Sequence, residues 1–166
     1  MRRPRLREML EAAPFPRNAR LAVIDIGAGY GAVTEELLRL FPAAQVTLQD
    51  YSQPMLVEAR RRLAAQAGQL HYVVCDLTDA SWPGVVGGSF DLAVSAIALH
   101  NLRDEAKIFA CYRAIHDLLR PAGWFLDYDL FFDGVEGHLS ALRDCGFARV
   151  ECPWQEPPRA IVAAGR

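Results

Sequence analysis

The chain has 166 residues, of which 52% are hydrophobic and 23% are charged. This length suits a single domain over residues 1–166, and the apolar content excludes a mainly disordered chain. The 18 basic and 20 acidic residues give a formal net charge of -2, which argues against bulk binding of nucleic acid because phosphate neutralisation needs a basic surplus. No apolar run approaches the roughly 20 residues that a membrane span needs.

The N-terminal segment, residues 1–20, is rich in arginine and lacks the apolar stretch of a secretory signal. We interpret it as a short cap segment with a solvated basic face, in which Leu6, Met9 and Leu10 would let it fold over a cofactor cleft. The four cysteines form no C-x2-C pair, which predicts reduced thiols in a cytoplasmic protein. The histidines show no metal-ligand spacing, so we expect no catalytic metal.

Short apolar runs alternate with amphipathic helical patterns along the chain. The apolar runs predict strands at residues 21–26, 45–49, 70–74, 90–95 and 124–128, with two more around residues 149–153 and 160–164. The helical patterns predict helices at residues 30–41, from Ser52 until Gly68, at residues 104–119 and at residues 135–145. Residues 81–89 are rich in glycine and predict a loop or a broken short helix, and residues 120–123 predict a turn.

The alternation of strands and helices implies a parallel sheet with helices on both faces. The last two strands leave no room for a crossover helix, so we expect them to form an antiparallel hairpin at the sheet edge. The predicted fold is therefore α/β, a Rossmann-like doubly wound seven-stranded sheet that is mostly parallel. In such sheets ligands bind outside the carboxyl ends of the strands, where the strand order reverses.

The glycine-rich segment Gly27-Ala28-Gly29-Tyr30-Gly31 connects the first predicted strand to the helix that follows. Glycines are needed where the backbone turns sharply and approaches a ligand closely. With Ala32 the segment also satisfies the dinucleotide pattern G-x-G-x-x-A. Two cofactor classes therefore compete at this loop, a dinucleotide and S-adenosylmethionine.

Asp25, two residues before Gly27, distinguishes the two cofactor classes. A carboxylate about 4 Å from a phosphate charge would cost about 4 kcal/mol at an effective dielectric near 20. S-adenosylmethionine carries an ammonium and a sulfonium instead, and a nearby carboxylate favours both. The alternative is that Asp25 only caps the glycine turn.

Two further acids follow the second and third strands at positions that suit a nucleoside. Asp50 lies 19 residues after Gly31, the offset of a carboxylate that accepts hydrogen bonds from ribose hydroxyls, although it could instead cap the next helix. Tyr51 can lie against the adenine face or serve as a packing residue. Asp76 can accept from the adenine amino group, with the backbone N–H of Leu77 donating to a ring nitrogen.

These segments, in this order, resemble class I S-adenosylmethionine-dependent methyltransferases over nearly the whole chain. Residues 23–31 are similar to the first motif of the family, 50–55 to its ribose-binding turn, 72–76 to its adenine-binding strand end, 90–102 to its fourth-strand motif and 118–125 to its turn into the fifth strand. In that turn Ala122 stands where a second glycine is usual. The resemblance implies S-adenosylmethionine as cofactor, S-adenosylhomocysteine as product, and cofactor contacts from Asp25, Gly27, Ala28, Gly29, Tyr30, Gly31, Asp50, Tyr51, Met55, Asp76, Leu77 and Ser95.

The resemblance also bears on the methyl acceptor. The fourth-strand motif reads Ser95-Ala-Ile-Ala98, not the Asn/Asp-Pro-Pro-Tyr of enzymes that methylate planar amino groups, which implies a small-molecule acceptor. Only residues 129–136 separate the fifth strand from the last helix, so the substrate lid is minimal. We expect an open acceptor site, a homodimer or partner subunit that completes it, or a protein that binds the cofactor without efficient turnover.

His100 is the candidate general base for an acceptor O–H or N–H, because it follows the fourth strand and imidazole titrates near neutral pH. The alternative is a histidine that packs beside the cofactor or bonds to the backbone. Asp127 and Asp129 lie near the end of the fifth strand, where structural or solvated roles are favoured for each. A nicotinamide-dependent reductase is a weaker hypothesis, because Arg103 precedes Lys107 where a Tyr-x-x-x-Lys set needs tyrosine.

Overall fold

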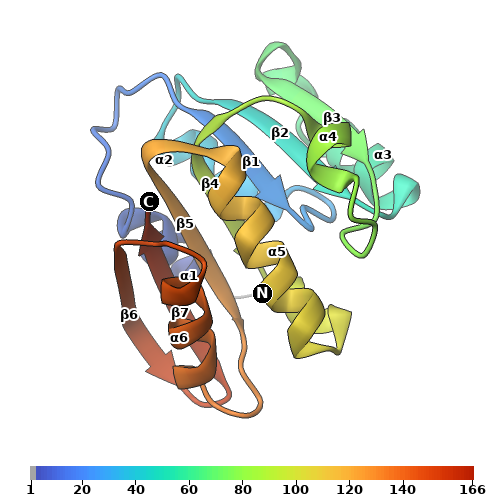
Figure 1. Cartoon of the computed structure of the whole chain (residues 1–166). Helices are drawn as coiled ribbons and strands as arrows, with labels where there is room; N and C mark the ends of the chain where they lie inside the picture. The colour runs from blue at the N-terminus through green and yellow to red at the C-terminus, as the bar shows by residue number, and fades with distance from the viewer. Residues whose placement is uncertain (1–2) are drawn as a thin grey trace.

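The computed structural model describes residues 3–166 as one sheet with helices on both faces (Figure 1). The strands are β1 (Ala22–Ile26), β2 (Gln45–Asp50), β3 (Leu70–Val74), β4 (Phe90–Ala96), β5 (Leu119–Leu130), β6 (Arg149–Glu156) and β7 (Arg159–Gly165). The helices are α1 (Arg3–Glu11), α2 (Ala32–Leu40), α3 (Gln53–Arg62), α4 (Trp82–Val86), α5 (Glu105–Leu118) and α6 (Glu136–Asp144). Two 3-10 helices, η1 (Ala64–Gln69) and η2 (Leu99–Leu102), complete the elements.

The strand order is β3-β2-β1-β4-β5-β7-β6, which confirms the predicted fold class. The first five strands pair in parallel, and β7 pairs antiparallel with both β5 and β6. The predicted hairpin at the C-terminus is therefore confirmed. Because the order reverses between β1 and β4, the expected ligand crevice lies above the carboxyl ends of these two strands.

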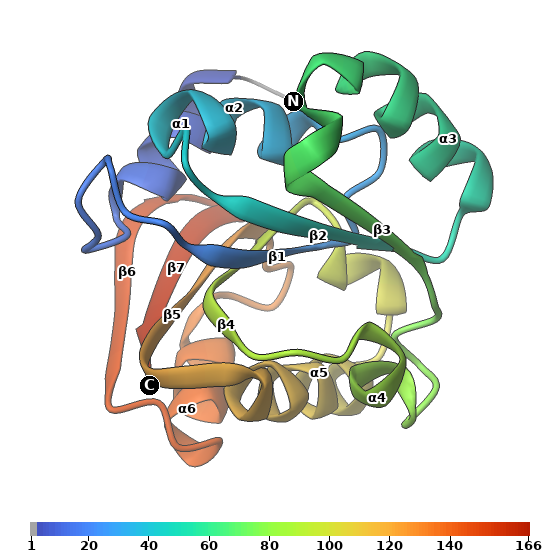
Figure 2. The same ribbon diagram turned by 90° about the horizontal axis from the view of Figure 1, so that it is seen from above.

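Helices cover the sheet in two layers, with α1, α2 and α3 on one face and α4, α5 and α6 on the other (Figure 2). Successive residues of the central strands point to opposite faces of the sheet and pack in two separate hydrophobic cores. Val23 of β1 and Val94 of β4 belong to the core under α1–α3, whereas Ile24 and Ala93 belong to the core under α4–α6. The nearly continuous apolar runs of the central strands reflect burial on both faces.

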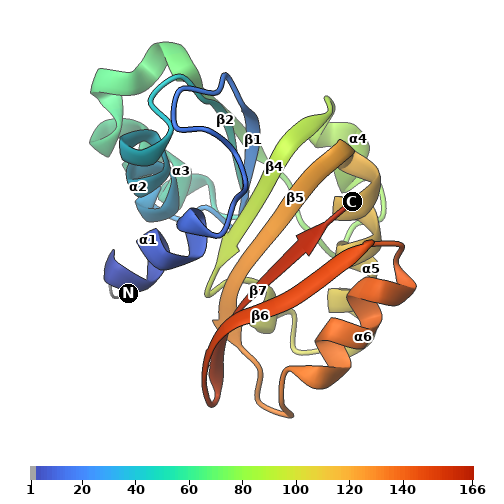
Figure 3. The same cartoon turned by 90° about the vertical axis from the view of Figure 1, so that its left-hand side faces the viewer.

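The N-terminal segment forms α1, which packs against α2, β5 and β7 on the same side of the sheet as α2 (Figure 3). Its residues Leu6, Met9 and Leu10 are fully buried in the core under α1–α3. The segment therefore contributes to the hydrophobic core of the domain. Its further role as a cover of the cofactor cleft stays a prediction.

Three predicted element boundaries are wrong, each for a local reason, whereas the short helix that sequence allows within residues 81–89 is confirmed. The first helical pattern begins at Ala32 because Gly31 has a left-handed φ of 82°. The α-helix that follows β2 ends at Arg62, and Gly68 lies inside η1 instead of stopping an α-helix. The predicted turn at residues 120–123 is part of β5, which runs for 12 residues. Residues 82–86, within the segment predicted as a loop or broken helix, form α4.

Candidate functional site

The glycine loop after β1 is shaped by three left-handed residues, Gly27, Gly29 and Gly31, with φ of 64°, 53° and 82°. A Cβ at position 27 would lie 2.5 Å from Ala98 Cβ, and a Cβ at position 31 would lie 2.7 Å from Leu63 Cδ1. Glycine is thus required twice, by backbone conformation and by space. The close approach to Ala98 joins this loop to the segment that follows β4.

Asp25 is fully buried beneath this loop. Its Oδ2 accepts hydrogen bonds from Thr34 N at 3.2 Å and from Thr34 Oγ1 at 2.6 Å, so the carboxyl group ties β1 to the first turn of α2. Its Oδ1 has no hydrogen-bond partner among the described residues. Burial raises the pKa of Asp25 to about 7, although the bonds from Thr34 oppose the shift. Its direct contact with a cofactor stays a prediction.

Asp50 lies at the carboxyl end of β2 and bonds to the glycine loop. Its Oδ2 accepts from Gly29 N at 2.8 Å and its Oδ1 accepts from Ser52 N at 2.8 Å. A carboxylate has about four lone-pair sites, so two remain for ribose hydroxyls. Of the two roles that sequence allows, the bond to Ser52 at the start of α3 supports capping, and it leaves ribose binding open.

Gln49 is a functional position that sequence reasoning missed. Its buried side chain accepts from Gly27 N at 3.1 Å and donates to the carbonyl oxygen of Cys75 at 2.7 Å. The amide therefore links the loops after β1 and β3, the two ends of the predicted cofactor cleft. The available signal was an amide side chain at the end of an otherwise apolar buried strand, since such a group must find partners there.

The exposed side chains around the predicted cofactor cleft come from two of the predicted segments, residues 23–31 and 50–55. Tyr51 is 78% exposed, and Met55 and Tyr30 are 37% and 36% exposed. One face of the Tyr30 ring is covered by the Arg62 guanidinium, whose carbon lies 4.6 Å from the ring centroid. Tyr30 is therefore held against α3. Met55 Cε lies 3.4 Å from the position of a Cβ at Gly29, so it lines the loop directly.

The remaining predicted cofactor contacts differ in exposure. Asp76 is exposed, and its Oδ1 accepts from Thr78 N and Oγ1, both at 2.8 Å, which lowers the pKa of Asp76. Leu77 and Ala28 lie partly or fully buried beside the loops. Ser95 is fully buried, and its hydroxyl oxygen has no partner among the described residues.

His100 lies on η2, directly after β4, and forms a two-point contact with Asp129 at the end of β5. Its Nδ1 lies 2.5 Å from Asp129 Oδ1, and its backbone N donates to Asp129 Oδ2 at 3.0 Å. Asp129 Oδ1 also accepts from Leu130 N at 2.8 Å, so the carboxylate receives donors on both oxygens. The His100 side chain is 15% exposed and that of Asp129 only 2%. A carboxylate at Nδ1 favours the tautomer that leaves Nε2 as a proton acceptor.

The backbone that carries His100 is strained. Ile97, a β-branched residue, has a φ of 52°, and its N donates to the carbonyl oxygen of Tyr128 at 2.8 Å. A non-glycine residue in this region costs of order 1–3 kcal/mol and persists only where the surroundings enforce it. Phe132 lies beside His100, with its ring 6.3 Å away in an edge-on arrangement, and is 70% exposed.

Asp127 lies two residues before Asp129 on the same face of β5, but the two carboxyl groups differ in their hydrogen-bond partners. The residue is buried, and neither carboxyl oxygen has a partner among the described residues. Burial, together with the neighbouring Asp129 carboxylate, raises the pKa of Asp127 well above its ordinary value. Burial thus favours the protonated form of Asp127, while Asp129 carries the contacts to His100.

The other histidines do not join this site. His138 bonds through Nδ1 to the hydroxyl of Tyr112 at 2.9 Å in the core under α4–α6. Over residues 3–166 no three His, Cys, Asp or Glu side chains come together in a metal-binding arrangement. In the same part of the chain no helix has the length and apolar character needed to cross a membrane.

Comparison with known proteins assigns the chain to a family. A family model described as a methyltransferase domain matches residues 23–123. The chain is 35% identical to a malonyl-[acyl-carrier protein] O-methyltransferase of Magnetococcus marinus over 57% of this chain and 33% of that protein. It is also 35% identical to a release factor glutamine methyltransferase of Koribacter versatilis over 96% of this chain and 65% of that protein.

Solved structures show the same fold. An O-methyltransferase family protein from Burkholderia thailandensis has a TM-score of 0.78 at 19% identity, over 98% of this chain and 55% of that one. Human N-acetylserotonin methyltransferase in complex with S-adenosylmethionine has a TM-score of 0.76 at 16% identity, over 97% of this chain and 51% of that one. The chain thus spans about half of these structures, and between 33% and 65% of the two curated relatives. On its match over residues 23–123, the chain belongs to the methyltransferase domain family and has the class I methyltransferase fold.

Proposed function

We propose that the domain binds S-adenosylmethionine along the carboxyl ends of β1, β2 and β3 and transfers its methyl group to a small-molecule acceptor that loses a proton from oxygen or nitrogen. The observation that carries this proposal is the His100–Asp129 pair, with Nδ1 and Oδ1 2.5 Å apart, on the segment that touches the glycine loop through Ala98. This contact supports a proposed base and a proposed cofactor loop on adjoining segments.

The residues present suit this cofactor. Gly27 and Gly29 leave space that a side chain would fill, Asp50 keeps free lone pairs for ribose hydroxyls, and the unpartnered oxygen of Asp25 lies under a loop that would face a cationic amino acid. The bound cofactor supplies a methyl group already activated on a sulfonium. A diphosphate is disfavoured here because it would approach two carboxyl groups at the same loop.

His100 and Asp129 would have different roles at the acceptor, His100 as the general base and Asp129 as a positioning residue. Asp129 accepts the Nδ1 proton of His100 and so orients the ring, which makes it a positioning residue. Nε2 of His100 would then take the proton that the acceptor atom loses as it gains the methyl group, while the methyl carbon–sulfur bond breaks and S-adenosylhomocysteine leaves. General base catalysis of this kind contributes about 10²–10⁴-fold, and alignment of the reacting atoms contributes separately.

Cofactor binding is tested by titration calorimetry with S-adenosylhomocysteine. We expect Asp50→Ala to weaken binding by about 1–3 kcal/mol, because the ribose hydroxyls and Gly29 N lose their acceptor. Asp79→Ala is the matched control, since Asp79 makes a similar local contact to Ser81 outside the cleft. Binding of a nicotinamide dinucleotide in place of S-adenosylhomocysteine would contradict the proposal.

Catalysis is tested by methyl transfer from radiolabelled S-adenosylmethionine to panels of phenols, carboxylic acids and amines. With any acceptor that is methylated, we expect His100→Ala to lower turnover by about 10²–10⁴-fold while the affinity for S-adenosylhomocysteine stays unchanged. Asp129→Asn should lower turnover less and should shift its pH profile. Full turnover in His100→Ala would remove His100 from the mechanism.

A second candidate function is a non-catalytic cofactor-binding subunit, and one observation favours it. Only residues 131–135 separate β5 from α6, and Phe132 beside His100 is 70% exposed, so this side of the cleft lacks a cover from the described chain. This candidate predicts binding of S-adenosylhomocysteine with no methylated product for any acceptor class tested.

A further inference from the structure

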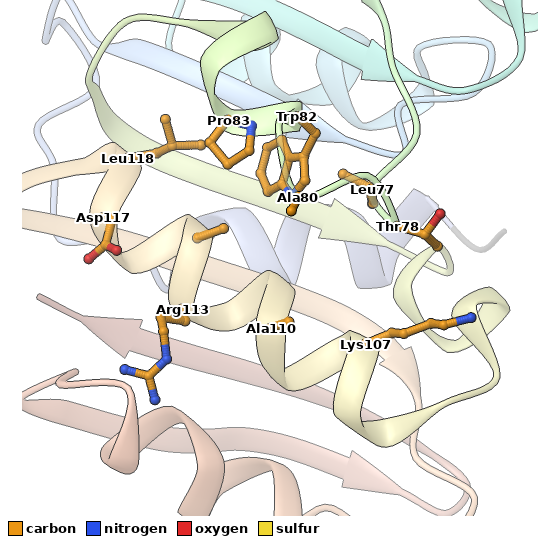
Figure 4. A pocket seen from close by; sticks show the side chains of 11 residues that line it. Leu77, Thr78, Ala80, Trp82, Pro83, Lys107, Ala110, Arg113, Asp117 and Leu118 are labelled. Atoms are coloured by element: carbon orange, nitrogen blue, oxygen red, sulfur yellow. The ribbon is translucent and has the colours of Figure 1, made fainter.

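A hollow lies between α4 and α5 (Figure 4), and it shares Leu77 with the predicted adenine-binding segment. Its volume is about 430 Å³, within the range of pockets that hold small molecules. Neither His100 nor any residue of the glycine loop lines it. The residues that line it are Leu77, Thr78, Ala80, Trp82, Pro83, Lys107, Ala110, Arg113, Ala114, Asp117 and Leu118.

The hollow exists because α4 is short and the facing side chains of α5 are small. Helix α4 has 5 residues and ends at Gly87, whose φ is 62°, whereas α5 has 14 residues. The shorter helix covers only part of the longer one. Ala110 then leaves space opposite Trp82 and Pro83 (Figure 4), and the small Ala114 also lines this space. Trp82 is only 3% exposed, so its indole is a fixed wall of this space.

Charge at the two ends of the hollow is unequal. Lys107 lies at the end next to Thr78 and Asp117 at the end next to Leu118 (Figure 4). Asp117 already accepts from His116 Nδ1 at 3.1 Å. The ammonium of Lys107, the only lysine of the chain, has no hydrogen bond or ion pair within residues 3–166. The charge of Lys107 helps to lower the pKa of Asp76, but no described residue makes a direct contact with this ammonium at the mouth of the apolar space.

From this geometry we propose that the hollow between α4 and α5 binds a planar aromatic carboxylate, with its ring between Trp82 and the alanines of α5 and its carboxylate at Lys107. A flat ring suits the walls because aromatic pairs prefer offset or edge-on contacts with an indole. A carboxylate at the mouth stays partly hydrated while it pairs with the ammonium. An extended aliphatic chain or a cation matches neither feature as well.

Such a ligand would also influence the cofactor cleft, an inference that rests on the proposed function. Leu77 and Thr78 line the hollow and directly follow Asp76, whose carboxylate is held by Thr78 N and Oγ1. A ligand that orders these two residues changes the segment predicted to hold adenine. By linkage, the change in affinity for S-adenosylhomocysteine equals the reciprocal change for the aromatic ligand.

The test is calorimetric titration of the whole chain with 2-naphthoate and with its uncharged analogue 2-naphthalenemethanol. We expect one site per chain with a dissociation constant of about 1 mM or below for 2-naphthoate. Ala110→Phe, which fills the hollow from an exposed position, should weaken both ligands at least tenfold. Ala106→Phe on the same helix lies outside the lining and should leave both unchanged.

The Lys107→Met variant removes the ammonium but keeps the cavity, so it tests the contribution of the charge alone. It should weaken 2-naphthoate by roughly two- to fivefold, the usual range for an exposed ion pair, and leave 2-naphthalenemethanol unchanged. Arg143→Met on α6 is the charge control and should affect neither ligand. Unaltered binding to Ala110→Phe, or no heat at several millimolar 2-naphthoate, would overturn the proposed site. Equal weakening of both ligands by Lys107→Met would overturn the carboxylate assignment.

The influence on the cleft is measured separately, as the affinity for S-adenosylhomocysteine with and without saturating 2-naphthoate. An altered affinity supports the link, and an unchanged affinity contradicts it. If S-adenosylhomocysteine does not bind at all, the proposed function fails, whereas the titrations with 2-naphthoate still decide whether the hollow is a binding site.

Discussion

Three carboxyl groups at the ends of β1 and β5 are buried to a similar degree, yet their hydrogen-bond partners give them different roles. Asp25 has donors on one oxygen, Asp129 has donors on both, and Asp127 has none. The pKa of the unpaired acid, Asp127, is raised because burial penalises its charged form and the Asp129 carboxylate lies nearby. Sequence predicted that all three residues lie near the carboxyl ends of their strands. It could not predict their hydrogen bonds, because the donors come from segments distant in sequence, such as η2 and α2.

The first prediction concerns the pH dependence of stability. In the folded chain the pKa of Asp25 is raised from 3.8 to about 7, so between these values the folded state holds a proton that the unfolded state has lost. Its contribution therefore falls as pH rises from about 4 to about 7, by about 4 kcal/mol in the limit of full burial. Urea unfolding of Asp25→Asn at several pH values should show a flatter profile than the parent chain.

The second prediction contrasts two acids on one strand. Asp127→Val should raise the free energy of unfolding at pH 7 by about 1–3 kcal/mol, because it removes a buried group with no partner. Asp129→Val should lower it, because three donors lose their acceptor. Urea unfolding measures both changes. The same sign for the two substitutions would show that strand propensity, not hydrogen bonding, decides the effect.

At the scale of elements, the strands follow their apolar runs closely and the errors fall at helix ends. The period of apolar residues decides which face of a strand or helix is buried, but it says little about the last turn. The α-helix after β2 ends before Gly68 because its final turns tighten into η1. The start of β5 is hidden in sequence because Arg120-Pro-Ala-Gly123 has the composition of a turn, and it bulges out of the ladder between Leu119 and Trp124, which pair with Phe90 and Leu92.

Ala122 in this strand yields the third prediction. Its φ of 64° is a conformation that costs a residue with a Cβ about 1–2 kcal/mol. Ala122→Gly should therefore stabilise the chain by about 0.5–1 kcal/mol, after allowance for the greater freedom of glycine in the unfolded state. Differential scanning calorimetry measures the change. Ala148→Gly is the control and should destabilise, since Ala148 is not among the left-handed residues.

At the scale of the whole molecule, sequence was sufficient for the layer order, the parallel sheet and the antiparallel edge. These features follow from chain-wide alternation and from the lack of room for a crossover between the last two strands. The connections inside the site were not predictable in this way. Gln49 forms hydrogen bonds to residues 27 and 75, and His100 contacts residue 129. These side chains become neighbours only when the sheet folds, so the sequence pattern does not reveal the contacts.

The fourth prediction treats the domain as one cooperative unit. A ligand that binds only the folded state at 100 times its dissociation constant stabilises the chain by about 2.7 kcal/mol. For a domain of this size the melting temperature should then rise by about 5–10 °C with S-adenosylhomocysteine. Thermal scans with and without it measure the shift, and adenosine at equal concentration serves as the weaker control.

The contact between Gly27 and Ala98 has a consequence for how donor and base meet. With 2.5 Å between Ala98 Cβ and the place of a Cβ at position 27, the two loops touch through a single methyl group and have no slack between them. Any shift of the first loop on filling of the cleft must carry the His100 segment with it. Under the proposed function, this contact would keep the imidazole and the sulfonium aligned through the backbone itself, without a closing flap.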